Sequence, residues 1–227
     1  MLIRIPGVLT ADELARCRNR LSTANWQDGR HSAGYLSQKV KRNAQLADTD
    51  PITRELGKLI LLALDRSEAF ASAALPLKIV PPLFNRYAAE QNYGNHIDGA
   101  IRPISDTPHK VRTDLSATIF IADPEDYDGG ELVIQDTFGE RAVKLPAGDM
   151  VLYPGTNVHR VAPVTRGVRL ASFFWIQSMV RDENHRSILF QLDSAIQSLA
   201  GDVPEHRGLV DAAGVYHNLL RCWADTD

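Results

Sequence analysis

The chain has 227 residues, of which 44% are hydrophobic and 23% are charged, and its formal net charge is −3. This composition fits one globular domain with a sizeable core, and the acidic balance gives no basic surface for nucleic acid. The longest apolar run, LILLAL at 59–64, is too short to cross a bilayer. The start MLIRIPGVL does not resemble a signal peptide, and the two cysteines lie at opposite ends. We therefore expect a cytoplasmic protein with no membrane or nucleic-acid partner.

The first 76 residues predict two helices separated by a polar segment. Thr10 and Glu13 form a capping box, which begins a helix that runs to about residue 22. Asp50-Pro51 begins a second helix, with proline at the first position and apolar residues recurring on one face. Residues 26–49 are polar and contain glycine, which indicates strands and loops. We interpret residues 1–76 as a support for the core that follows.

Residues 77–178 have the pattern of many short strands. The segment LSATIFI alternates between two faces, and ELVIQ, RAVKL, DMVLY and VRLASFFWI follow with Asp-Pro, Gly-Gly and Pro-Ala-Gly turns between them. Short strands at this spacing favour a sandwich or jelly roll over βαβ units. After residue 182 the apolar spacing becomes helical again. The sequence thus predicts a mainly β protein with flanking helices, in which 179–227 is a helical extension that packs on the barrel or on another subunit of a homo-oligomer.

The most informative residues are His96, Asp98 and His159. Residues i and i+2 of an extended strand face the same way, so His96 and Asp98 can reach one ion. Two imidazoles and one carboxylate are the ligand set of a non-haem Fe(II) site with open positions. Chance alone gives about one His-x-acid pair in this composition, so the pair has weight only in context. It follows an aromatic run, a glycine comes directly after it, and His159 arrives after a strand-rich stretch.

Arg169 adds the second half of the pattern. It lies inside the apolar run GVRLASFFWI, where a buried guanidinium needs a partner. Strand periodicity places it on one face with Ala171, Phe173 and Trp175, and if that face points inward, Arg169 is a positive charge at the end of an apolar pocket. Its planar fork suits a dicarboxylic co-substrate that has one carboxylate at the metal and the other at the arginine. The combination predicts an oxygenase that uses dioxygen and a 2-oxo acid.

The pattern FNRY-x5-Y-x2-HID, then TIFI…DYDGGEL, then PAGDMVLYPGTNVHRV…GVR, resembles the prolyl-4-hydroxylase-like Fe(II)/2-oxoglutarate dioxygenases. More narrowly, it is similar to the bacterial PKHD-type hydroxylases over essentially the whole chain. The resemblance implies a double-stranded β-helix (jelly roll), one Fe(II), 2-oxoglutarate as co-substrate, and L-ascorbate as a helper that reduces the iron again. It also implies hydroxylation of a C–H bond with decarboxylation of 2-oxoglutarate to succinate.

The same resemblance implies roles for single residues. His96, Asp98 and His159 are the implied iron ligands, and Arg169 is implied to bind the distal carboxylate of 2-oxoglutarate. Tyr87, and Ser116 opposite it, are implied to donate hydroxyls to the same molecule, and Tyr93 falls where prolyl hydroxylases contact their substrate. No catalytic residue beyond the metal ligands is expected.

Residues 99–113 form a long polar segment beside this site, and such loops are commonly lids. Arg102, His109 and Arg112 are therefore candidates for substrate contact, whereas the remaining histidines are expected at the surface or in packing roles. The substrate stays open among peptidyl proline, a free amino acid and a small iron-chelating metabolite. Three alternatives also stay open: a non-catalytic iron and 2-oxoglutarate sensor, a nucleic-acid demethylase with the same metal chemistry, and a metal-dependent cupin.

Overall fold

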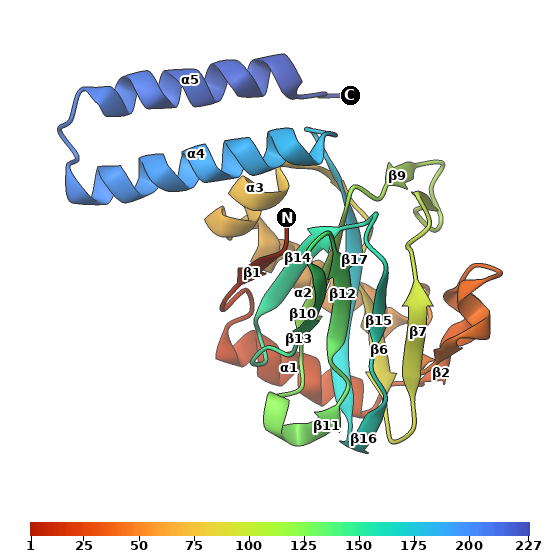
Figure 1. Ribbon diagram of the computed structural model, residues 1–227. Helices are drawn as coiled ribbons and strands as arrows, with labels where there is room; N and C mark the ends of the chain where they lie inside the picture. Colours follow the sequence, from red (N-terminus) through yellow and green to blue (C-terminus); the bar gives the residue numbers. More distant parts are fainter.

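The computed structural model describes residues 1–227, which fold into two facing antiparallel sheets with helices outside them (Figure 1). Three helices cover the outer face of the larger sheet, and a pair of long helices extends away from the barrel on one side. The fold class predicted from the sequence, a mainly β jelly roll with N-terminal helices and a C-terminal helical pair, is confirmed. No helix is both long and apolar enough to span a membrane.

The larger sheet contains the strand that carries Arg169. The strands of this sheet follow one another in the order β1 (Ile3–Ile5), β14 (Met150–Pro154), β10 (Leu115–Phe120), β17 (Arg169–Ser178), β6 (Leu83–Tyr87), β4 (Ala44–Gln45) and β2 (Gln27–Asp28). Strand β5 (Pro76–Ile79) also pairs with β17, the strand that begins with Arg169. Strands from the first 50 residues thus extend the sheet at both edges. The register places Tyr87 directly opposite Arg169 on β6 and β17.

The smaller sheet carries both histidines of the HxD…H pattern. Its order is β13 (Gly139–Val143), β12 (Leu132–Asp136), β15 (His159–Val161), β7 (Asn92–His96) and β3 (Lys41–Arg42). In the pairing of β15 with β7, His159 lies opposite His96. Two ribbons complete the β structure: β11 (Tyr127–Gly129) with β16 (Val164–Gly167), and β8 (Ile101–Pro103) with β9 (Lys110–Arg112).

Alternation along β10 explains how one strand serves both the core and the site. Leu115, Ala117 and Ile119 face the helices and belong to the main hydrophobic core. Ser116 and Thr118 face the other way and line the pocket between the sheets. All six residues of the strand are buried. The alternation therefore separates side chains that face the helices from side chains that face the pocket, and not buried side chains from exposed ones.

The helices of the N-terminal part begin where the sequence predicts. Helix α1 (Ala11–Ser22) starts with the reciprocal capping box of Thr10 and Glu13, and α2 (Pro51–Asp65) starts after Asp50, whose side chain accepts from the backbone N–H of Ile52. A third helix, α3 (Glu68–Ala74), was not foreseen because its seven residues are too few to show helical periodicity. Short 3₁₀ turns occur at Gly29–Ser32, Ser37–Lys39 and Pro124–Asp126.

Residues 99–113 differ from the expectation of one long loop. They fold back as the β8–β9 hairpin, in which Arg102 pairs with Val111. Each strand has only three residues and a mostly polar surface, which is too short for an alternating pattern to appear in the sequence. The hairpin lies beside the mouth of the barrel and carries Arg102 toward the pocket.

The Gly129-Gly130 pair allows the chain to turn sharply before β12. Both residues have positive φ, at 71° and 67°, a conformation that glycine adopts without strain. A Cβ on Gly129 would lie 2.0 Å from the carbonyl oxygen of Pro163, so no other residue fits without a backbone shift. This turn lets β11 pair with β16 while β12 continues into the smaller sheet.

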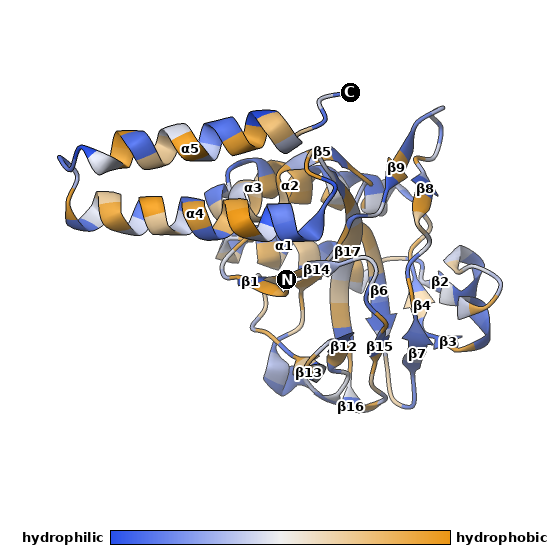
Figure 2. Ribbon diagram, turned by 45° about the horizontal axis from the view of Figure 1, so that its top comes forward, coloured by the Kyte–Doolittle hydropathy of each residue, from blue (hydrophilic) through white to orange (hydrophobic).

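The C-terminal pair consists of α4 (Glu183–Asp202) and α5 (Gly208–Trp223). Helix α4 packs on α3, and α5 packs along α4. Apolar and polar residues alternate along both helices (Figure 2), yet no residue of α5 is fully buried. The pair joins the barrel through a small cluster around Leu75, Val180 and Leu189.

Candidate metal centre

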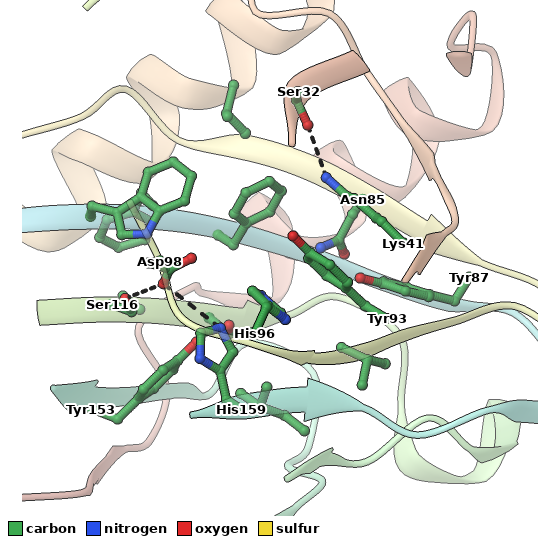
Figure 3. A pocket seen from close by; sticks show the side chains of 18 of the residues that line it. Ser32, Lys41, Asn85, Tyr87, Tyr93, His96, Asp98, Ser116, Tyr153 and His159 are labelled. Carbon is green, nitrogen blue, oxygen red and sulfur yellow. Dashed lines mark hydrogen bonds and ion pairs between the residues drawn. The ribbon is translucent and has the colours of Figure 1, made fainter. Parts of the chain in front are cut away.

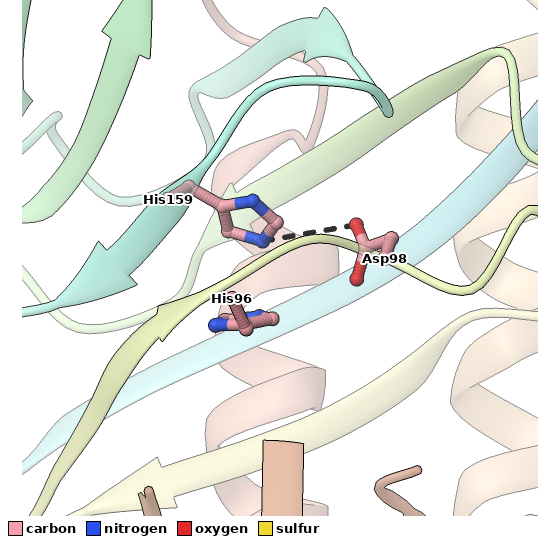
Figure 4. A group of neighbouring side chains, drawn as sticks. All are labelled: His96, Asp98 and His159. Carbon is pink, nitrogen blue, oxygen red and sulfur yellow. Dashed lines mark ion pairs between the residues drawn. The ribbon is translucent and has the colours of Figure 1, made fainter. Parts of the chain in front are cut away.

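His96, Asp98 and His159 meet in one place between the two sheets (Figure 4). His96 ends β7, Asp98 follows two residues later, and His159 begins the neighbouring strand β15. One ligand atom from each residue lies within 4.8 Å of the others, and Nε2 of His159 is 3.7 Å from Oδ2 of Asp98. The strand register and the HxD spacing together produce this cluster.

Hydrogen bonds to the backbone fix the orientation of both imidazoles. Nδ1 of His96 is 2.8 Å from the carbonyl oxygen of Gly94, and Nδ1 of His159 is 3.0 Å from that of Asn157. A carbonyl oxygen only accepts, so each Nδ1 carries the proton and each Nε2 presents its lone pair. Both rings therefore offer Nε2 to a metal, which is the arrangement that outer contacts impose on metal-binding histidines.

The protonation states of the cluster also suit a cation. Burial, together with repulsion from His159, lowers the pKa of His96, so its ring stays neutral at neutral pH. Burial opposes ionisation of Asp98, but attraction to His159 and hydrogen bonds from Ser116 and Trp175 outweigh it and lower its pKa. One carboxylate and two imidazoles that present Nε2, each partly or fully shielded from solvent, form a set of donors that fits Fe(II).

Neighbouring side chains hold the three residues in position. The Ser116 hydroxyl donates to Oδ2 of Asp98 at 2.7 Å, and Tyr93 stacks on His96 with ring centres 3.6 Å apart. The rings of Tyr153 and His159 pack edge to face, with ring centres 5.1 Å apart. In this structure the Ser116 proton is thus engaged by the carboxylate of Asp98, and its predicted contact with 2-oxoglutarate stays a prediction.

Arg169 lies in the same pocket, deep in the barrel. It is 1% exposed, and its guanidinium carbon lies 5.4 Å from the ring centres of both Tyr87 and Phe120. Its one side-chain hydrogen bond is a long one, 3.4 Å from Nη1 to Oδ1 of Asn85, and its buried Nε has no partner. No acidic residue pairs with it. Because a buried charge without a partner is energetically unfavourable, Arg169 is suited to bind an anion from outside the chain.

Tyr87 faces this arginine from the opposite strand. Its side chain is 1% exposed, and burial raises the pKa of its phenol far above the usual value even though Arg169 acts in the opposite sense. The hydroxyl therefore keeps its proton across the physiological range and can donate it to an anion held by Arg169. The hydroxyl of Tyr127 is also buried without a hydrogen-bond partner, and burial raises its pKa although the charge of Arg169 acts in the opposite sense.

The pocket brings together most of the site residues that the sequence predicts, and Figure 3 labels six of them, His96, Asp98, His159, Tyr87, Tyr93 and Ser116. The three ligands, Arg169, Tyr87, Ser116, Tyr93 and Arg102 all line it. Several polar or aromatic lining residues were given no role from the sequence, among them Lys41, Asn85, Tyr153 and Trp175. For Trp175 the signal was present, since strand periodicity already put it on the face of Arg169. Lys41 and Asn85 had no local signal.

Several other candidates lie outside the pocket. Arg112 forms an ion pair with Asp114, 2.6 Å from Nε to Oδ1, and does not line the pocket. His109 is exposed on the β8–β9 hairpin. The remaining histidines occupy surface or packing positions as predicted: His31, His206 and His217 are exposed, and His185 stacks on Trp223.

With this geometry in view, comparison with known proteins gives the class. Residues 82–177 match the model of the 2OG-Fe(II) oxygenase superfamily. Among solved structures, a Pseudomonas putida prolyl-4-hydroxylase has a TM-score of 0.51 at 19% identity, with 78% of this chain and 92% of that chain covered. HygX from Streptomyces hygroscopicus, solved with nickel, 2-oxoglutarate and hygromycin B bound, has a TM-score of 0.53 at 17% identity, covering 78% and 82%. These two likenesses concern the fold.

The family is narrower than the superfamily. Residues 183–225 match the model of the PKHD-type hydroxylase C-terminal domain, which corresponds to α4 and α5. A PKHD-type hydroxylase of Parvibaculum lavamentivorans is 54% identical over 226 residues, with 100% of both chains covered. The chain belongs to the PKHD-type hydroxylase family. It is a 2-oxoglutarate- and Fe(II)-dependent dioxygenase, as its sequence predicted.

Proposed function

We propose that His96, Asp98 and His159 bind the Fe(II) of this hydroxylase and that Arg169 binds the distal carboxylate of 2-oxoglutarate. One observation carries the proposal: a buried guanidinium without an acidic partner lies in the same pocket as three converging ligand atoms. A dicarboxylate with its 2-oxo acid end at the metal supplies the missing charge at its other end. The two halves of the pocket thus require the same small molecule.

The bound metal supplies activation of dioxygen, coupled to decarboxylation of 2-oxoglutarate to succinate and to hydroxylation of a substrate C–H bond. The protein side chains position the reactants and control the surroundings. Arg169 and Tyr87 orient 2-oxoglutarate, and Ser116 holds the carboxylate of Asp98 toward the metal. Phe173 and Trp175 give the pocket an apolar wall that keeps water from the reacting atoms.

Tyr93 and Arg102 are proposed to face the substrate. Tyr93 stacks on the ligand His96, and burial raises the pKa of its phenol, so its hydroxyl remains a donor. Arg102 reaches the pocket from the β8–β9 hairpin. We also propose the division of the chain inferred from its sequence, with a catalytic core at 77–178, a support at 1–76 and a helical extension at 179–227.

Three further parts of the proposal concern the conditions of turnover. L-ascorbate is proposed as a reductant that restores Fe(II) after uncoupled cycles, so its omission is expected to shorten the life of the enzyme rather than lower the initial rate. The cytoplasm is proposed as the compartment. Packing of α4 and α5 on another subunit is proposed because no residue of α5 is fully buried within one chain.

The test measures Fe(II) and 2-oxoglutarate binding under argon, then succinate release after oxygen is admitted. Asp98→Ala is expected to lose Fe(II) binding and 2-oxoglutarate-dependent succinate release. Asp65→Ala, an exposed carboxylate at the end of α2, is the matched control and is expected to behave as the wild type. Full Fe(II) occupancy in Asp98→Ala would contradict the ligand assignment. Tight binding of both molecules without succinate under any condition would instead indicate a sensor.

A further inference from the structure

The pocket contains a second positive site, formed by Lys41 and Arg102. The two residues come from distant parts of the chain, β3 and the β8–β9 hairpin. Along β17, Arg169 is four residues from Phe173 and six from Trp175, which corresponds to about 13 and 20 Å in an extended strand. Lys41 lies over Phe173 and Arg102 over Trp175, at 6.0 and 4.0 Å from the ring centres. This second site is therefore separate from the deep arginine.

Lys41 is a buried cation with only neutral hydrogen-bond partners. It is 4% exposed, and its Nζ donates to Oγ of Ser32 and to Oε1 of Gln45, both at 2.8 Å. Its ammonium also lies 5.2 Å from the ring centre of Tyr93 (Figure 3). Burial, reinforced by repulsion from Arg102, lowers the pKa of Lys41 to about 8. The surroundings of Lys41 in the ligand-free protein therefore disfavour its positive charge.

Arg102 is likewise without a counter-ion. Its side chain stacks on Trp175, and its buried Nε has no hydrogen-bond partner. The acids that act on Lys41 are Asp98 and Asp28. Asp98 is the proposed metal ligand, and Asp28 is bound to Arg30 through several hydrogen bonds. Neither carboxylate is free to neutralise the pair.

The position of the pair relates it to the substrate. Lys41 lines the metal pocket, whereas Arg102 and Trp175 line both this pocket and an adjoining outer cleft between the hairpin and α2. Arg102 and Trp175 therefore lie where the outer cleft meets the metal pocket, and Lys41 lies further in. The rings that the two cations lie over, Phe173 and Trp175, have centres 5.5 Å apart. Two like charges over neighbouring rings, without an acidic partner, attract an anionic group.

We propose that Lys41 and Arg102 bind an anionic group, carboxylate or phosphate, of the substrate that is hydroxylated. This inference rests on the proposed function, since it takes 2-oxoglutarate to occupy the Arg169 end of the pocket. It narrows the substrate to molecules that carry an acid group near the C–H bond presented to the metal. The aromatic wall of Tyr93, Phe173 and Trp175 admits an apolar body next to that acid group.

The test is anaerobic calorimetry on protein loaded with Fe(II) and saturating 2-oxoglutarate. The probes are benzoate, phenyl phosphate and the neutral benzamide, which share one ring and differ in the acid group. We expect at least one anion to bind and benzamide to bind at least about tenfold more weakly. The preferred anion distinguishes a carboxylate substrate from a phosphate substrate.

The variants Lys41→Met and Arg102→Gln are each expected to weaken anion binding by about tenfold or more while 2-oxoglutarate affinity stays unchanged. Lys39→Met and Lys110→Met remove exposed charges nearby and are the controls. Equal binding of all three probes, competition between the anions and 2-oxoglutarate, or full anion binding in both variants would overturn the proposal. Failure of the wild type to load Fe(II) and 2-oxoglutarate, seen in the first titration, would instead contradict the proposed function.

Discussion

Replacement of Arg169 by lysine separates charge from geometry in the proposed 2-oxoglutarate site. The substitution keeps one positive charge on β17 but removes the planar fork that can bind a carboxylate through two parallel hydrogen bonds. In the structure the guanidinium has only one long hydrogen bond, to Asn85, and its Nε is unpaired, so most of its donors are available for a ligand. The variant is therefore expected to lose 2-oxoglutarate affinity at the cost of few contacts within the protein.

The size of the effect follows from the lost hydrogen bond. A hydrogen bond to a charged group contributes about 1.5–3 kcal/mol, so Arg169→Lys is expected to weaken 2-oxoglutarate on the order of 10- to 100-fold. Anaerobic calorimetry of the Fe(II)-loaded protein measures this affinity directly. Fe(II) affinity is expected to stay the same because the arginine contacts none of the three ligands. Arg166→Lys, an exposed arginine paired with Asp128, is the control.

Replacement of the same residue by methionine gives an independent readout through stability. An unpaired buried charge destabilises a fold, so Arg169→Met is expected to raise the free energy of unfolding of the ligand-free protein by about 1–4 kcal/mol. Added 2-oxoglutarate is expected to stabilise the Fe(II)-loaded wild type and not the variant. Equal 2-oxoglutarate affinity in wild type and Arg169→Lys, or a variant Arg169→Met that is less stable than the wild type, would refute this reasoning.

Three further predictions concern other parts of the molecule. Ser116→Ala is expected to weaken Fe(II) binding about tenfold, because the Ser116 hydroxyl orients Asp98, and to leave the 2-oxoglutarate affinity of the Fe(II)-loaded protein unchanged. If calorimetry shows unchanged Fe(II) binding and weaker 2-oxoglutarate binding, Ser116 donates directly to 2-oxoglutarate. Iodoacetamide at pH 8 is expected to alkylate Cys222 and not Cys17, because Cys17 is buried and burial raises its pKa to about 11. Peptide mass spectrometry identifies the alkylated cysteine, and alkylation of Cys17 in the folded protein would contradict the prediction. Amides of 99–113 are expected to exchange faster than those of β10 and to slow only when substrate joins Fe(II) and 2-oxoglutarate.

The parts of the fold that the sequence predicted are those with a repeated local signal. The capping box at Thr10, the Asp50-Pro51 helix start and the alternation along β10 each concern neighbouring residues, and each appears as predicted. Helix α3 and the β8–β9 hairpin were not predicted because they are too short to show a repeated pattern in the sequence. Tertiary contacts stabilise such short elements.

The site shows the same division between local and long-range information. The HxD spacing, the second histidine and an arginine in an apolar run are visible in the chain, and the structure brings them into one pocket. Lys41 could not be predicted, because it comes from a polar segment with no repeated pattern. It reaches the pocket only because β3 pairs with β7, which places Lys41 opposite Tyr93. Such a pairing depends on the folded sheet and not on neighbouring residues.

The central claim is that one Fe(II) and one 2-oxoglutarate share this pocket in a defined orientation. Anomalous scattering from crystals grown under argon with both molecules tests it most directly. We expect one iron peak bonded to Nε2 of His96, Nε2 of His159 and a carboxylate oxygen of Asp98, with the distal carboxylate of 2-oxoglutarate on Arg169. An iron peak away from these atoms, or a distal carboxylate directed to Lys41 and Arg102, would contradict the account.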